Sequence, residues 1–205
     1  MLLTDHEYGA VRRIWEGRCQ QTAAEVSTVS LPALFESSQE VVDAIFAACT
    51  DRTRLIVISH ITSPTAVTLP IDEICQRAQQ EGVQVCVDGP HAVAQLPLNL
   101  DQIPCDYYCA SCHKWLCAPF GTGFLYAAAE HHARLGPLTL SWGQLPPDEV
   151  SHWSDEFLWS GTRDPSGYLA IPAAIDFMES VGLENFQQQL VDFERPLPPI
   201  SEPVP

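Results

Sequence analysis

Residues 106–115 read Asp-Tyr-Tyr-Cys-Ala-Ser-Cys-His-Lys-Trp, and the rest of the chain is organised around this stretch. A short β-prone run, Tyr107 to Ala110, is followed by Ser111, His113 and Lys114. Lys114 is the only lysine among the ten basic residues of the 205-residue chain. A solitary lysine beside a histidine, just after an apolar strand, suggests an amine that forms a Schiff base. The alternative is a turn lysine without chemistry, and this stretch alone does not decide between the two.

The overall charge argues against two classes of partner. The formal net charge is −16 and the nine arginines are scattered, whereas nucleic acid and anionic membranes both require a basic patch. No apolar run approaches the roughly 20 residues of a membrane span. The first residues also lack the basic segment and long apolar core of a signal peptide. We therefore expect a soluble, cytoplasmic protein that binds neither nucleic acid nor membrane.

Eight cysteines occur in the chain, and in the cytoplasm we expect them to be thiols. Residues 109–113 match the C-x-x-C-H pattern of c-type haem attachment, and the local cysteine cluster also suggests zinc. Haem attachment takes place in exported proteins, and a structural zinc site usually pairs two C-x-x-C-like knuckles, whereas one is present here. We expect no metal site, and interpret the cysteines as small buried hydrophobic residues.

Apolar runs and helical stripes alternate along the chain. Such alternation with short loops is typical of an α/β fold with a mostly parallel sheet flanked by helices. Leu2-Leu3 resembles the end of a buried strand, and Pro172 is expected to kink or break the last long helix. We assign residues 1–183 to one domain and residues 184–205 to a short helix and a proline-rich tail. The expected strands are 25–31, 54–59, 83–87, 107–110 and 123–126, and the expected helices are 5–21, 37–49, 71–81, 164–181 and 184–193. In the first of these helices we expect Thr4 or Asp5 as N-cap and an apolar stripe of Val11, Ile14 and Trp15.

Polar groups follow three of the expected strands. They are Ser59-His60 with Thr62-Ser63, then Asp88 with His91, and then Ser111 with His113-Lys114. Ligands of parallel sheets bind beyond the carboxyl ends of the strands, so these groups converge if the strands are neighbours. Asp88 follows a buried strand directly, and desolvating it is costly unless it meets a cation. The alternative is an ordinary turn or N-cap aspartate before Gly89-Pro90.

Pyridoxal 5′-phosphate would explain the three strand ends together. The cofactor needs a lysine for its Schiff base and a carboxylate that keeps the pyridine nitrogen protonated. Its phosphate needs hydroxyl, imidazole and backbone donors. Few other ligands require one lysine, one buried acid and this set of donors.

Several ordered motifs resemble the class V aminotransferase family of pyridoxal-phosphate enzymes of fold type I. The resemblance covers about residues 2–185, and it is nearest to the isopenicillin N epimerase-like branch, with cysteine desulfurases and cysteine lyases as relatives. The motifs are Ser59-His60-Ile61-Thr62-Ser63-Pro64-Thr65, Val87-Asp88-Gly89-Pro90-His91-Ala92, Ser111-Cys112-His113-Lys114-Trp115-Leu116, Pro119-Phe120-Gly121-Thr122-Gly123-Phe124-Leu125-Tyr126 and Ser160-Gly161-Thr162-Arg163-Asp164-Pro165.

The resemblance implies a role for each matching position. Lys114 is the Schiff-base lysine, Asp88 pairs with the pyridine nitrogen, and His91 lies near the phenolic oxygen of the cofactor. His6 stacks on the pyridine ring. The phosphate ligands are Ser111 and His113, with Thr162 reaching the phosphate of a neighbouring subunit, so the resemblance implies a homodimer. The remaining cofactor-binding position is Ser63, where desulfurases have asparagine.

The resemblance also implies an amino acid or peptide-like amine as the substrate, which is epimerised, cleaved by β-elimination or transaminated. Two departures weaken a desulfurase interpretation, namely Ser63 and Cys112. Family members are about twice this long, so we expect this chain to lack an N-terminal phosphate-binding segment and the small C-terminal domain. The second hypothesis is therefore a catalytically incomplete fragment or a partner that dimerises without turnover.

Overall fold

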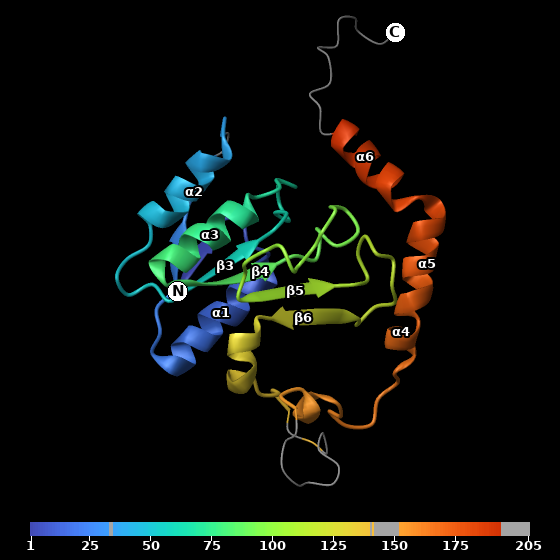
Figure 1. Ribbon diagram of the computed structural model, residues 1–205. Coiled ribbons are helices and arrows are strands. Elements are labelled where there is room, and N and C mark those ends of the chain that lie inside the picture. Colours follow the sequence, from blue (N-terminus) through green and yellow to red (C-terminus); the bar gives the residue numbers. More distant parts are fainter. Residues whose placement is uncertain (33–34, 140, 142–151, 194–205) are drawn as a thin grey trace, which may run out of the picture.

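The computed structural model describes residues 1–32, 35–139, 141 and 152–193. In this part of the chain a six-stranded sheet has the order β2-β1-β3-β4-β5-β6 (Figure 1). The first five strands in this order are parallel, and β6 is antiparallel to β5. The predicted α/β fold with a mostly parallel sheet is confirmed. The strands are β1 (Leu2–Thr4), β2 (Ser27–Val29), β3 (Leu55–Ser59), β4 (Gln84–Asp88), β5 (Tyr107–Ser111) and β6 (Gly123–Ala127).

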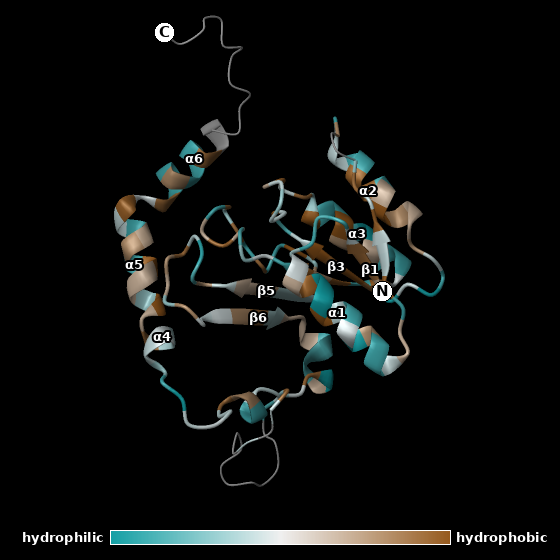
Figure 2. Ribbon diagram, turned by 180° about the vertical axis from the view of Figure 1, so that it is seen from behind, coloured by the Kyte–Doolittle hydropathy of each residue, from teal (hydrophilic) through white to brown (hydrophobic). Residues whose placement is uncertain are grey.

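Helices cover both faces of the sheet. Two of them, α2 and α3, lie on one face, and α1 lies against the other, as the two opposite views show (Figures 1 and 2). The segment from α4 to α6 runs along the outer side of the molecule, beyond β5 and β6 (Figure 1). The helices are α1 (Gly9–Thr22), α2 (Ser38–Ala47), α3 (Ile71–Glu81), α4 (Ser166–Leu169), α5 (Ile171–Val181) and α6 (Leu183–Phe193), with 3₁₀ turns at Ala129–Arg134 and Asp155–Phe157.

The hydrophobic core lies between the sheet and the α2–α3 layer. Alternate residues of β3, such as Ile56 and Ile58, belong to this core together with Ile45 of α2 and Ile74 of α3. Val57, between them, is also buried, on the other face, so β3 is apolar on both faces up to Ser59. Burying one such side chain contributes roughly 1.5–3 kcal/mol of favourable transfer free energy. The continuous apolar run that predicted this strand therefore reflects burial on both faces.

The first helix begins later than predicted. We expected it over residues 5–21 with Thr4 or Asp5 as N-cap, but α1 begins at Gly9, after Tyr8. Both expected caps have other partners, because Thr4 ends β1 and the Asp5 carboxylate accepts a hydrogen bond from the backbone N–H of Leu31. Residues 5–8, which lie between β1 and α1, therefore form a loop at the carboxyl edge of the sheet. Ile14 of the expected apolar stripe is 66% exposed.

The C-terminal segment is broken where a proline was expected to break it. Residues 164–181 form two helices, α4 and α5, and Pro172 occupies the first turn of α5. The predicted short helix is α6, which contacts the rest of the chain through Gln187 and Phe186. The domain division at residue 183 stays a prediction. The proline-rich stretch 195–199 and the prolines at 146 and 147 lie outside the described residues.

Two further expectations concern the cysteines and the membrane. All eight cysteines are unbridged, as predicted for thiols. Among the described residues, no helix combines the length and apolar character that crossing a membrane requires.

Candidate functional site

Three neighbouring strands end in a row of polar side chains. Ser59 of β3 is paired with Asp88 of β4, and Asp88 is paired with Cys109 of β5. Side chains alternate along a strand, and Val87 and Tyr108 belong to the core on the α3 side. Ser59, Asp88 and Cys109 therefore share the opposite face, the one against which α1 lies. The ends of β3, β4 and β5 therefore lie side by side, as predicted.

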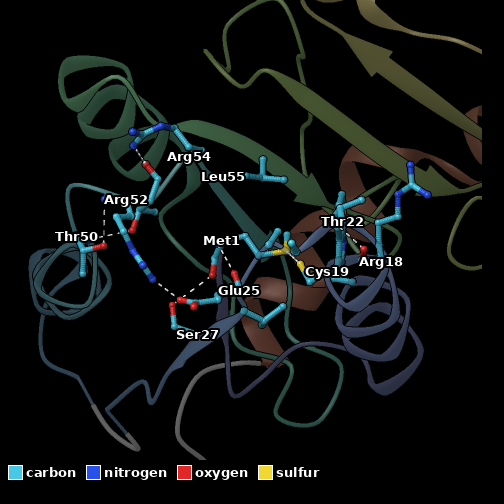
Figure 3. A pocket seen from close by; sticks show the side chains of 15 residues that line it. Met1, Arg18, Cys19, Thr22, Glu25, Ser27, Thr50, Arg52, Arg54 and Leu55 are labelled. Carbon is cyan, nitrogen blue, oxygen red and sulfur yellow. Dashed lines mark hydrogen bonds and ion pairs between the residues drawn. The ribbon is translucent and has the colours of Figure 1, made fainter.

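A cavity of 490 Å³ opens beside this row. Its wall includes Asp88, Ser111 and His113, and the start of β6 closes its other side. A larger cavity of 620 Å³ lies around the N-terminal end of β1 and the start of β3, and Figure 3 shows its lining. There Arg52 pairs with Glu25, and Arg54 donates to the backbone carbonyls of Asp51 and Thr53. The smaller cavity is the candidate site because Asp88, Ser111 and His113, which follow the strand ends, line it.

Lys114 lies between two aromatic rings that come from different parts of the chain. Its Nζ is 3.0 Å from Nε2 of His91 and 5.8 Å from the ring centroid of Tyr8. The other ring nitrogen of His91, Nδ1, accepts a hydrogen bond of 3.2 Å from the indole N–H of Trp115. Burial lowers the pKa of His91, and the Lys114 charge lowers it further, so both effects favour the neutral imidazole.

Asp88 is a largely buried acid, and no cation among the described residues is bonded directly to it. Burial raises the pKa of its carboxyl, and the Lys114 charge and the Cys109 thiol, 3.8 Å from Oδ1, act in the opposite direction. An ionised carboxylate in such surroundings is stabilised by a cationic partner inside the cavity. A protonated pyridine nitrogen would supply that charge.

Glu7 is a site residue that the sequence analysis did not single out. Its side chain is 8% exposed, and its two oxygens accept hydrogen bonds from Thr4 Oγ1 at 2.6 Å and Ser59 Oγ at 2.7 Å. Burial raises the pKa of Glu7, although the two hydroxyl donors oppose this, and the nearby Asp88 charge raises it too. The signal in the sequence was the same as for Asp88, an acid soon after a buried strand. It was hidden because residues 5–8 were assigned to a helix.

A buried histidine–tyrosine pair lies on the core side of the same strand ends. His60 Nδ1 is 2.9 Å from the hydroxyl of Tyr108, and burial lowers the pKa of His60 to about 4. The backbone N–H of His60 also donates to the carbonyl of Asp88. Any side chain at Gly89 would collide with Tyr108, since a Cβ there would lie 2.0 Å from its hydroxyl oxygen. The turn after Asp88 therefore packs directly against the buried Tyr108 ring.

The other end of the cavity suits an anion. His113 Nδ1 is buried and has no hydrogen-bond partner among the described residues, and Ser111 lies beside it on the wall. An imidazole N–H and a hydroxyl are ordinary phosphate donors. Together with the carboxyl of Asp88 and the amine of Lys114, they match the groups that pyridoxal phosphate needs. The residues present therefore fit the predicted cofactor.

Three of the predicted site residues make no hydrogen bond to this cluster in the described part of the chain. His6 is partly exposed and its Nδ1 is 2.8 Å from Asp5 Oδ1, while Ser63 and Thr162 are exposed. Their predicted roles stay predictions. In the described ranges, one group of three potential metal ligands has its ligand atoms within 4.8 Å of one another, namely Asp106, Glu130 and His131. The cysteines and the histidine of residues 109–113 form no such group there. His131 Nε2 and Asp106 Oδ1 are 2.5 Å apart, so they already satisfy each other.

The chain is similar to curated proteins over nearly its whole length. It is 37% identical over 211 residues to isopenicillin N epimerase of Streptomyces clavuligerus, covering 96% of this chain and 53% of the relative. It is 40% identical over 201 residues to isopenicillin N epimerase of Amycolatopsis lactamdurans, covering 93% and 50%. A cysteine desulfurase of Cronobacter sakazakii is 31% identical over 205 residues, with 96% and 48% covered. The chain thus spans about half the length of these relatives.

Solved structures share the fold. The cystine C–S lyase C-DES in complex with its product cysteine persulfide has a TM-score of 0.80 at 24% identity, and the match covers 93% of this chain and 52% of that one. A C-DES variant with glycine covalently linked to its PLP cofactor has a TM-score of 0.82 at 22% identity, with 94% and 52% covered. The sequence profile of the family described as aminotransferase class-V matches residues 1–194. This chain therefore belongs to the aminotransferase class-V family.

Proposed function

We propose that the chain binds pyridoxal 5′-phosphate through Lys114, and that the protein acts on an amino acid or a peptide-like amine, most like isopenicillin N epimerase. The observation that carries the proposal is the position of Lys114. Its Nζ lies 3.0 Å from His91 Nε2, in the cluster that also holds the buried carboxyl of Asp88. The epimerase relatives, at 37% and 40% identity, support the reaction class.

When bound, pyridoxal phosphate withdraws electrons from the Cα of an attached amine, so that a bond at Cα becomes labile. Lys114 Nζ, as a free amine, would take the proton from Cα and return it. The Asp88 carboxylate would hold a proton on the ring nitrogen, because a buried carboxylate is stabilised by the resulting ion pair. His113 Nδ1 and the Ser111 hydroxyl would bind the phosphate. The Gly89 turn fixes Asp88 and His91 relative to each other.

The first experiment locates the covalent bond. Pyridoxal phosphate is added to the purified chain, a visible absorbance band is recorded, and the adduct is reduced with borohydride and mapped by mass spectrometry. We expect the modification on Lys114, which is the only lysine in the chain. Lys114→Ala and Lys114→Arg should both lose the band and the adduct. A reduced adduct at the N-terminal amine that persists in Lys114→Ala would overturn the assignment.

Cleavage of cysteine is the second candidate, favoured by the desulfurase relative at 31% identity. Incubation with amino acids separates the possibilities, because epimerisation changes the enantiomer ratio and cysteine cleavage releases sulfide or sulfane sulfur. Cofactor binding with neither product would favour a catalytically incomplete chain.

We also infer a cytoplasmic homodimer. Thr162 is exposed, and apolar side chains of the α4–α5 segment such as Leu169 and Phe177 are exposed too. A second subunit would cover this surface and bring Thr162 to the neighbouring site. Sedimentation equilibrium tests the stoichiometry, and a monomer that binds the cofactor fully would contradict the shared site.

A further inference from the structure

The imidazole of His91 contacts a different group at each nitrogen. The indole N–H of Trp115 lies 3.2 Å from Nδ1, and the amine of Lys114 lies 3.0 Å from Nε2. Trp115 follows Lys114 directly in the chain, whereas His91 reaches them from the loop after β4. The two contacts therefore form a closed arrangement of lysine, histidine and tryptophan.

The chemistry of the three groups limits where the hydrogens can be. An indole nitrogen only donates, so a hydrogen bond from Trp115 requires a bare Nδ1 on His91. A neutral imidazole carries one hydrogen, and this hydrogen must then lie on Nε2. Nε2–H then points toward Lys114 Nζ, 3.0 Å away, where a lone pair on nitrogen would accept it. If the hydrogen lay on Nδ1 instead, two donors would face each other at 3.2 Å.

We propose that Trp115 is a positioning residue that fixes His91 in the Nε2–H form and so presents a hydrogen-bond donor to the nitrogen of Lys114. The proposal rests on the proposed function in one respect, since it concerns the lysine to which the cofactor would bond. The same hydrogen would face the cofactor side of that nitrogen once the bond is made. Trp115 acts through His91 and does not itself touch Lys114 Nζ in the described contacts.

The position of the indole is held from two sides. The turn after Lys114 is closed by a hydrogen bond from the backbone N–H of Cys117 to the carbonyl of Lys114, and Cys117 adopts a positive φ of 61° there. On the outer side, the ring of Phe186 in α6 lies with its centroid 6.2 Å from that of Trp115. Gln187, the next residue, donates to the carbonyl of Ala94 in the loop that carries His91. Trp115 and His91 are thus attached to the same helix.

A fixed hydrogen on Nε2 defines what His91 can do at the lysine nitrogen. In this form Nε2 donates a hydrogen bond to a lone pair there and does not accept one. A lone pair on this nitrogen is what bonds to an aldehyde or accepts a proton from Cα. The indole N–H therefore presents a donor to the reactive atom of Lys114 without contacting it.

The test replaces a single atom. Trp115 is substituted with the benzothiophene analogue of tryptophan, in which sulfur replaces the indole N–H and the ring shape is kept. Long-range ¹H–¹⁵N spectra of the cofactor-free full chain at neutral pH distinguish bare from protonated ring nitrogens, and His91→Gln identifies the His91 signals among those of the seven histidines. In the unaltered protein we expect a bare Nδ1 and a protonated Nε2. In the analogue we expect the Nδ1 signal to move toward the protonated position.

Two outcomes overturn the proposal: an Nδ1–H form in the unaltered protein, or an unchanged His91 signal in the analogue. Phe186→Leu is the matched control, because it alters the packing of Trp115 but keeps the N–H, and it should leave the His91 tautomer unchanged. The first outcome needs no variant, so a folding defect cannot hide it. The spectra also do not depend on the cofactor. A confirmed tautomer without any adduct on Lys114 would leave this inference standing and overturn the proposed function instead.

Discussion

Glu7 and Ser59 are 52 residues apart in the chain and are joined by a hydrogen bond of 2.7 Å from the serine hydroxyl to the glutamate Oε2. Thr4 donates to the other oxygen, so the carboxyl bridges the end of β1 and the end of β3. The loop that carries His6 and Tyr8 is thereby fixed over the row that begins with Ser59. The bridge uses a buried acid near a second buried acid, Asp88, and this arrangement has a measurable pH dependence.

We expect Glu7→Gln to gain stability relative to the unaltered protein as the pH rises from about 4 to 7. The pKa of Glu7 is raised by burial, so between its ordinary and its raised pKa the folded state binds a proton that the unfolded chain has lost. The contribution of Glu7 is therefore fully present below the ordinary pKa and is lost as the pH rises through the raised one. Glutamine keeps an acceptor and does not ionise.

Urea unfolding at several pH values measures this difference. Glu179→Gln, on the exposed surface of α5, is the matched control and should show no such trend. Glu7→Ala should be less stable at every pH by about 1–3 kcal/mol, because it leaves two hydroxyls without their acceptor. A difference between Glu7→Gln and the unaltered protein that stays constant with pH would contradict the raised pKa.

His60 should make the protein less stable as the pH falls, whereas Glu7 makes it less stable as the pH rises. Burial lowers its pKa to about 4, so as the pH falls below about 6.5 the unfolded chain binds a proton that the folded state does not. Its contribution is fully present above the ordinary pKa and decreases by about 3 kcal/mol as the pH falls to about 4. His60→Asn can keep an acceptor near the Tyr108 hydroxyl and should remove this acid-side loss. The free energy of unfolding of the unaltered protein and of His60→Asn is measured between about pH 4 and 6.5. The same pH dependence in both would contradict a buried neutral His60.

The sequence predicted the sheet well because its strands carry their own signal. β3 and β4 are apolar on both faces or nearly so, and the acids and hydroxyls at their ends mark the edge where ligands bind. The register between neighbouring strands could not be predicted from the sequence. This register pairs Ser59 with Asp88 and Asp88 with Cys109. The loop of residues 5–8 was also missed, because Thr4 and Asp5 are good helix caps and their competing partners, Glu7 and Leu31, are tertiary. Trp115 was read only as part of a motif, since its hydrogen bond to His91 spans 24 residues.

Gly89→Ala should destabilise the fold by more than about 3 kcal/mol. A Cβ at this position would lie 2.0 Å from the Tyr108 hydroxyl oxygen and 2.2 Å from two ring carbons, and Tyr108 is fully buried, so it cannot move aside. Gly17→Ala is the matched control, because its Cβ meets nothing within 4 Å and alanine favours the helix by up to about 1 kcal/mol. Thermal unfolding of both variants measures the contrast. Similar melting temperatures for the two would contradict the close packing of Gly89 against Tyr108.

His113→Ala should weaken the binding of pyridoxal phosphate at least about tenfold and leave the binding of unphosphorylated pyridoxal nearly unchanged. The reason is the buried Nδ1 of His113, which has no partner among the described residues and would donate to the phosphate. A hydrogen bond to a charged group contributes about 1.5–3 kcal/mol, which corresponds to a factor of about ten or more in affinity. Equilibrium titration of both ligands, followed by absorbance, separates the phosphate contact from the Lys114 bond, because only the phosphorylated ligand can use His113.

His152→Ala, at an exposed histidine outside the site cluster, is the control and should bind both ligands as the unaltered protein does. Equal losses for both ligands in His113→Ala would place His113 at the ring or the amine rather than at the phosphate.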